Sequence, residues 1–219
     1  MTFTQYIAGR VSNYMRQAGF TRKRKLFYKI INDIAYCIEF DSPGGILYTT
    51  FYILPLYIPA DTRYYSYGNR LNTISPKPLS LLRTTADSSE IKNWCEEFYC
   101  TLDRYVFPLF DRISSPQKLL SYLNELSAHK VFSVFFCPPY LVERLKLYTY
   151  LYQNDLDTVR YQLNTYRQAV LLTTTLITHV KDDYLHEAEQ IEEICFWSSE
   201  HRMLFFRNTI TDTTQKCID

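Results

Sequence analysis

The chain begins with apolar residues at helical spacing. They recur at intervals of three and four: Phe3, Ile7, Val11, Tyr14, Met15 and Ala18. This is the period of one face of a helix. Thr2 and Gln5 have the spacing of a capping box, and Gly19 can adopt the left-handed conformation that ends a helix. The pattern therefore predicts a helix from about residue 3 to residue 18.

A period of two follows this helix. Residues 25–31 are rich in strand-forming types, residues 34–40 alternate, and Asn32-Asp33 between them is a turn signal. A second turn, Ser42-Pro43-Gly44-Gly45, precedes a long third strand over residues 45–57. Connections this short allow only antiparallel pairing, because a parallel pair needs a crossover. We expect a meander of three strands, with a fourth short strand within residues 64–71.

Helical spacing returns in the second half of the chain. A helix that Ser88 or Ser89 caps is expected to run until Pro108 ends or kinks it. Further helices are predicted from Ser115-Pro116 and over residues 140–152, 156–169 and about 181–209.

These patterns predict an α+β fold: an N-terminal helix and an antiparallel β-meander of three to four strands, followed by a mostly helical C-terminal half. We expect residues 1–80 to form the helix-and-sheet region. Residues 88–219 would form a helical region packed on it, within one compact domain.

Composition narrows the class of protein. Hydrophobic residues make up 47% of the 219 residues and charged residues 21%, which excludes an intrinsically disordered chain. The net charge is +1, so nucleic acid is not expected as a partner. The charge is uneven, however, because residues 1–58 carry seven basic and three acidic side chains, whereas residues 151–219 carry six and eleven. This uneven charge indicates one of two arrangements. The basic and acidic segments either contact each other within the fold, or they form a dipolar surface that orients binding partners.

Localisation is predicted from the cysteines and the apolar runs. No basic segment followed by an apolar run opens the chain, so the six cysteines are interpreted as free thiols of a cytoplasmic protein. The longest uncharged stretch, residues 42–60, contains three prolines and two glycines, and its apolar part is too short for a bilayer. No membrane partner is expected.

Two segments are candidate binding sites. The run Arg22-Lys23-Arg24-Lys25 could bind a phosphate or an acidic protein surface, or it could be a solvated turn that protects the sheet from aggregation. Twenty tyrosines make the chain rich in interface-forming side chains. In the second segment, Tyr64, Tyr65, Tyr67 and Arg70 could stack on a ligand, or they could cover one face of the sheet.

No catalytic residue, metal site or cofactor is predicted. His179, Asp182, Asp183 and His186 share a helix face, but we interpret them as a solvated acidic surface. Cys137 with His129 could pair a nucleophile with a base, yet Cys137 ends an apolar run typical of a buried thiol. Five glycines leave little room for a glycine-rich phosphate-binding loop, and the chain has no Walker motif.

One resemblance covers about the first quarter of the chain. Its segments are Gly19-Phe20-Thr21-Arg22-Lys23, Phe27-Tyr28, residues 34–40 and residues 50–58. Together with the preceding helix they resemble a widespread bacterial domain family of unknown function. The family's Gln-Ser pair is replaced here by Glu39-Phe40-Asp41-Ser42. The family has no established catalytic residues. Some members look like components of toxin–immunity neighbourhoods, which implies a protein-binding role.

Three functions remain open from the sequence. The first is a non-enzymatic protein-binding module of the immunity or regulatory type, whose anchors would be aromatic and arginine side chains. The second is a small-ligand-binding protein or enzyme with a tyrosine-lined cleft that contains Tyr67 or Arg70. The third is a weak nucleic-acid binder that uses residues 22–25 and the tyrosine segment. The pattern does not define the oligomeric state.

Overall fold

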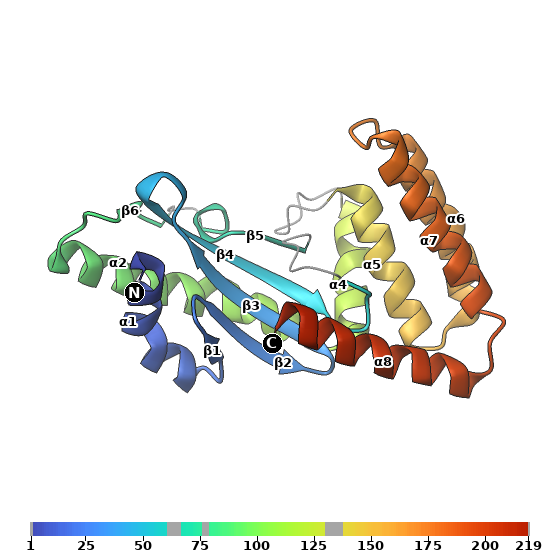
Figure 1. Cartoon of the computed structure of the whole chain (residues 1–219), viewed down its shortest axis with the longest axis horizontal. Helices are drawn as coiled ribbons and strands as arrows, with labels where there is room; N and C mark the ends of the chain where they lie inside the picture. Colours follow the sequence, from blue (N-terminus) through green and yellow to red (C-terminus); the bar gives the residue numbers. More distant parts are fainter. Residues whose placement is uncertain (1, 61–66, 76–78, 130–137, 219) are drawn as a thin grey trace. The chain divides into compact units, whose positions relative to one another are not determined.

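The computed structural model describes residues 2–60, 67–75, 79–129 and 138–218, and its elements are drawn in Figure 1. The described residues form two compact units. The sheet unit contains residues up to Pro55 together with residues 67–119, and the helical unit contains residues 56–60, 120–129 and 138–218. Each unit is described separately below.

The sheet unit is built on an antiparallel meander. Its strands run in the order β1-β2-β3-β4-β5, and the short strand β6 also pairs with β4. The bounds are β1 Thr21–Lys23, β2 Leu26–Ile31, β3 Ile34–Asp41, β4 Ile46–Pro55, β5 Gly68–Arg70 and β6 Leu82–Arg83. The predicted meander and the α+β class are therefore confirmed, with β1 and β6 as additions that are too short to produce a period in the sequence.

Both turns predicted between the strands, at Asn32-Asp33 and at residues 42–45, are present in the structure. Asn32 and Asp33 both have positive φ, 49° and 59°, as a two-residue hairpin turn requires. A short 3₁₀ turn, Pro43–Gly45, connects β3 to β4, and Leu71–Thr73 forms another after β5. The hairpin fixes the register in which Ile31 faces Ile34 and Leu26 faces Glu39. The register of β2 against β3 determines which side chains lie on the same face of the sheet. The turn at Asn32-Asp33 therefore also determines which residues of the two strands are buried in the core.

Three helical segments complete the sheet unit. Helix α1 spans Phe3–Gln17 with the expected capping box of Thr2 and Gln5. Helix α2 spans Ser88–Thr101, and its cap is Asp87 rather than either serine, because the Asp87 carboxylate accepts the first free N–H groups and Glu90 completes a capping box. The chain continues helically through a π-helical turn, Leu102–Val106, into α3, Phe107–Arg112. Pro108 therefore does not end the helix. It lies in the first turn of α3, where the backbone N–H group that proline lacks is not required for a helical hydrogen bond.

Aromatic rings join these helices to one face of the sheet. Phe98 is fully buried, with its ring centroid 5.6 Å from that of Phe40 on β3 and 5.1 Å from that of Trp94. On α3, the Phe110 ring lies 5.0 Å from that of Tyr36. Phe40 and Tyr36 share a sheet face because side chains two or four apart along a strand point the same way. This aromatic layer is the core of the sheet unit.

The helical unit contains five helices. They are α4 Pro116–His129, which starts in the sheet unit and continues here from Leu120, α5 Pro139–Tyr152, α6 Leu156–Leu172, α7 Thr178–Ile194 and α8 Ser199–Cys217. The turn between α5 and α6 forms at Asn154, whose φ of 61° is one that asparagine tolerates. The region predicted to be helical over about residues 181–209 is helical apart from one turn. It breaks at residues 195–198, where the Ser198 side chain caps α8. Among the described helices, none is long and apolar enough to cross a membrane.

Candidate protein-binding surface

The structure divides the basic run at residues 22–25 between two structural roles. The Arg22 guanidinium donates to Gln5 O at 2.9 Å and to Ser12 Oγ at 3.1 Å, so it attaches β1 to α1. Lys25 instead lies 3.3 Å from Glu39 Oε1 and 3.6 Å from Asp41 Oδ1 on β3. These two cations serve the fold and point to different elements.

The other two cations of the run have no such role. The side chains of Lys23 and Arg24 make no ion pair with any described residue. Arg24 lies in the turn between β1 and β2 with φ 55°. Only half of the run is therefore available to a phosphate or an acidic surface, which weakens the case for nucleic-acid binding.

The tyrosine segment is also divided. Tyr64 and Tyr65 lie outside the described residues. Tyr67 is 5% exposed and belongs to the core. Arg70 on β5 is exposed, and its guanidinium carbon lies 4.1 Å from the centroid of the Tyr48 ring. Of this predicted group, Arg70 is the described member that presents its side chain to solvent.

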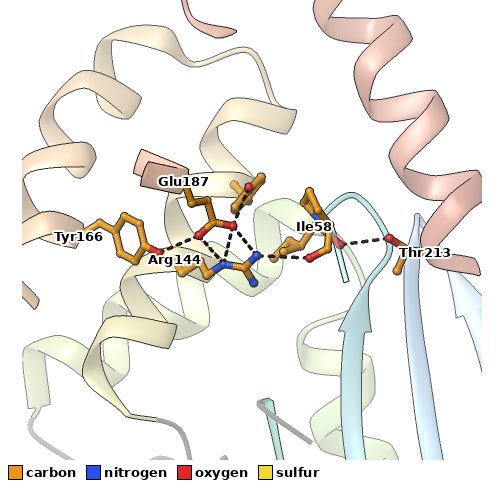
Figure 2. A network of polar contacts seen from close by, with 7 residues as sticks. Ile58, Arg144, Tyr166, Glu187 and Thr213 are labelled. Carbon is orange, nitrogen blue, oxygen red and sulfur yellow. Dashed lines mark hydrogen bonds and ion pairs between the residues drawn. The ribbon is translucent and has the colours of Figure 1, made fainter. Parts of the chain in front are cut away.

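Figure 2 shows the most extensive polar network of the helical unit, centred on Glu187 of α7. The Arg144 side chain of α5 donates to this carboxylate from Nε at 2.8 Å and from Nη2 at 2.5 Å. The hydroxyl groups of Tyr148 and Tyr166 donate to the same carboxylate at 2.9 and 2.8 Å. Three helices thus meet at one carboxylate.

The network extends to the chain segment at residues 56–60 (Figure 2). Arg144 Nη2 donates to Pro59 O at 3.3 Å, and Thr213 Oγ1 of α8 donates to Ile58 O at 3.2 Å. Tyr57 is fully buried and its hydroxyl lies 3.0 Å from Thr149 Oγ1. Helices α5 and α8 are therefore both held to residues 56–60, and α6 and α7 are held to α5 through Glu187.

The electrostatics of this network favour a structural role. Burial alone would raise the pKa of Glu187, but the Arg144 guanidinium and the hydrogen bonds from the two tyrosines outweigh it and lower that pKa. Burial and the Glu187 charge raise the pKa of Tyr166 far above its usual value. At neutral pH Glu187 is therefore ionised and the Tyr166 phenol is neutral. Because four donor groups already occupy the carboxylate, it has little capacity to accept a proton from a substrate.

Sequence reasoning missed this network. Arg144 and Tyr148 have i, i+4 spacing on one helix face, but Glu187 lies 43 residues from Arg144. No local pattern marks a pair at that separation. The signal that could have revealed it is that Glu187 is next to the apolar position Ala188, which is buried on α7. A carboxylate at the edge of a buried helix face needs a cation or hydrogen-bond donors.

The metal candidates form no site among the described residues, and the predicted Cys137–His129 pair includes a residue outside them. Among the described residues, no group of three histidine, cysteine or acidic side chains is placed to hold a metal ion. His186 and Glu189 on α7 are exposed and lie 3.3 Å apart, as expected for a solvated face. Cys137 lies outside the described residues, and the described cysteines form no disulfide with one another.

Large apolar side chains are exposed where α7 meets α8. This surface, the α7–α8 corner, consists of Phe196, Trp197, Met203 and Leu204. Phe196 is 79% exposed and Met203 is 59% exposed. The corner lies at the end of the helical unit where the chain turns from α7 into α8 (Figure 1).

An exposed aromatic side chain also lies on α6. The short connection of residues 173–177 joins the end of α6 to the start of α7, so the two helices, which lie side by side in Figure 1, run antiparallel. Tyr161, in the first half of α6, is 75% exposed.

The α7–α8 corner is held in shape by Arg202. Its guanidinium donates from Nε and Nη2 to Asn154 Oδ1, at 3.0 and 2.8 Å, and from Nη1 to the carbonyl oxygen of Trp197. The Trp197 ring makes an edge contact with Phe205. A charged side chain that is itself buried thus binds the backbone on which Phe196 and Trp197 sit.

Comparison with known proteins adds no relative to this picture. No protein-family model, no curated protein and no solved structure matches the chain.

Proposed function

We propose that the chain is a non-enzymatic protein-binding module of the immunity or regulatory type, and that a partner protein binds at the α7–α8 corner. The observation that carries the proposal is the exposure of four large apolar side chains within nine residues. Exposed apolar clusters on globular proteins mark interaction surfaces. Phenylalanine, tryptophan and methionine are types enriched in interfaces.

Preorganisation makes this corner suitable as an anchor. Arg202 fixes the backbone around Trp197 through Asn154, so little conformational freedom remains to be lost when a partner binds. The other exposed apolar group of the helical unit, at Leu171, Leu172 and Ile177, is entirely aliphatic. Aromatic side chains supply more of the energy in known interfaces than aliphatic ones.

Charge indicates the chemistry of the partner. Glu193 and Glu200 flank the corner, are exposed, and form no ion pair with any described residue. Residues 151–219 as a whole carry eleven acidic and six basic side chains. We therefore assign as partner a protein with an apolar patch bordered by lysine and arginine, because complementary charges select partners and speed association.

The test compares two single substitutions of similar exposure. Phe196→Ser alters the corner, and Leu172→Ser alters the aliphatic group at the opposite end of α7, where the side chain is 76% exposed. A stoichiometric partner is isolated from native extract on the wild-type chain, purified, and titrated against all three proteins. We expect Phe196→Ser to weaken binding about 30-fold, as for an interface hot spot, and Leu172→Ser to leave it unchanged.

Three outcomes would contradict the proposal. One is equal affinity of the partner for Phe196→Ser and the wild type. Another is recovery of no stoichiometric partner at any of several salt concentrations. The third comes from sedimentation of the pure chain: a dimer that Phe196→Ser abolishes would assign the corner to a second copy of this chain.

A further inference from the structure

A hollow of about 310 Å³ lies at one edge of the sheet unit, between the end of β3, the first half of β4 and β5. Its lining brings polar groups of Asp41, Tyr48, Thr50, Asn69 and Arg70 together with Pro43 and Gly68. The volume is at the lower end of the range for small-ligand sites. The hollow therefore suits a group of a few atoms rather than a large cofactor.

Arg70 is oriented in this hollow without a carboxylate partner. Its guanidinium stacks on the Tyr48 ring at 4.1 Å, and it forms no ion pair with a described residue. Its backbone is fixed from both sides, because Arg70 N donates to Asn69 Oδ1 at 2.8 Å and Thr73 Oγ1 donates to Arg70 O at 2.7 Å. A stacked guanidinium keeps its fork of N–H donors for two oxygen atoms of an oxyanion.

The carboxylate in the same hollow is already engaged. Asp41 Oδ1 accepts the backbone N–H of Ser42 at 3.0 Å and lies 3.6 Å from Lys25 Nζ. Asp41 thus has a cation beside it, which it shares with Glu39 at 3.3 Å from Lys25, and neither carboxylate forms an ion pair with Arg70. The positive charge of Arg70 is left for a ligand.

Gly68 permits the close approach that places Arg70. A Cβ at this position would lie 2.3 Å from Tyr52 Cβ and 2.4 Å from Phe51 O, distances that real Cβ atoms do not show. Only glycine therefore lets β5 pair with β4 in the register that sets Arg70 opposite Thr50. Thr50 brings a hydroxyl group to the hollow beside the guanidinium.

We propose that this hollow binds the oxyanion group of a small ligand, a carboxylate or a phosphate, with Arg70 as the principal donor. The Tyr48 ring orients the guanidinium, and Thr50 offers a further hydrogen bond. The site does not rest on the protein-binding role proposed above. It is a second binding function of the chain, located in the sheet unit.

The test titrates the full chain at constant ionic strength with inorganic phosphate in one arm and acetate in the other. Binding is followed by amide chemical shifts in NMR spectra. We expect saturation in at least one arm, with a Kd on the order of 1 mM and the largest shifts at Thr50, Asn69 and Arg70. The arm that saturates at the lower concentration identifies the oxyanion.

Substitutions decide whether Arg70 is the donor. Arg70→Gln should weaken binding about tenfold or more, and Arg70→Lys should weaken it less, because lysine keeps the charge but loses the fork. The matched control is Arg83→Gln, which removes an exposed arginine from β6 of the same sheet and should change nothing. Failure of both anions to bind, or equal affinity of wild type and Arg70→Gln, would overturn the proposal.

Discussion

Replacing Glu187 by glutamine is expected to lower the free energy of unfolding by about 3 kcal/mol at neutral pH, the magnitude seen when one member of a buried ion pair is removed. The Arg144 and Glu187 side chains are 15% and 16% exposed, and the pair is bidentate. Without the carboxylate, the guanidinium keeps its desolvation cost and loses its counter-charge. Urea denaturation followed by circular dichroism measures the change.

The matched control is Glu192→Gln on the same helix. Glu192 also pairs with an arginine, Arg167, but its side chain is 53% exposed. Exposed pairs contribute less than about 1 kcal/mol, so this substitution should have little effect. Equal losses for the two variants would contradict the structural role assigned to the Glu187 network.

The destabilisation should also depend on pH. Because the folded pKa of Glu187 is lowered, its ionised form stabilises the fold above the unfolded pKa of about 4.3, and this contribution is lost as the pH falls through the folded value. The wild type should therefore lose its advantage over Glu187→Gln in acid. A difference in unfolding free energy that stays constant from pH 7 to pH 3 would show that the charge is not the cause.

Phe98→Ala is expected to produce the largest loss of stability among the substitutions considered, about 4 kcal/mol. The ring is fully buried in the aromatic layer of the sheet unit, in contact with Phe40, Trp94 and Tyr99. Removing it deletes the transfer energy of the ring and leaves a cavity between stacked rings that cannot easily close. Chemical denaturation of the two proteins measures the difference.

Leu81→Ala is the control for this loss. Leu81 belongs to the same unit but is 64% exposed, so its removal should cost less than about 0.5 kcal/mol. If Phe98→Ala were no more destabilising than Leu81→Ala, α2 would not pack on the sheet as described.

Much of the sheet unit was predictable from the sequence, because helix caps and turns depend on interactions between residues that are close together in the chain. The capping box at Thr2 and Gln5 and the turn at Asn32-Asp33 are decided within a few residues, so the sequence alone shows them. Asp87 was missed as a cap for a related reason: Ser88 and Ser89 carry the same signal, and only backbone geometry distinguishes three adjacent candidates. The sequence predicts that Pro108 ends or kinks the helix, and it does not distinguish the two because the π-helical turn before Pro108 leaves no trace in the spacing of apolar residues.

The candidate sites were less predictable than the fold. Runs of charge or aromaticity in the sequence cannot show that Arg22 binds α1 while Lys25 binds β3, or that Tyr67 is buried while Arg70 is exposed. The sequence did not reveal the α7–α8 corner, because the helical pattern expected over about residues 181–209 does not locate the turn at residues 195–198. Phe196 and Trp197 lie in this turn and are exposed.

The sequence by itself determined the α+β class, the meander and its turns, and the positions of most helices, because hydrophobic period and turn chemistry act over short distances. Only the tertiary structure decided which polar groups meet and which apolar ones remain exposed. The ion-pair partner of Glu187 is Arg144, 43 residues away along the chain. Arg70 is positioned by the pairing of β5 with β4. Tertiary packing determines these contacts, and it brings together residues that are far apart in the sequence.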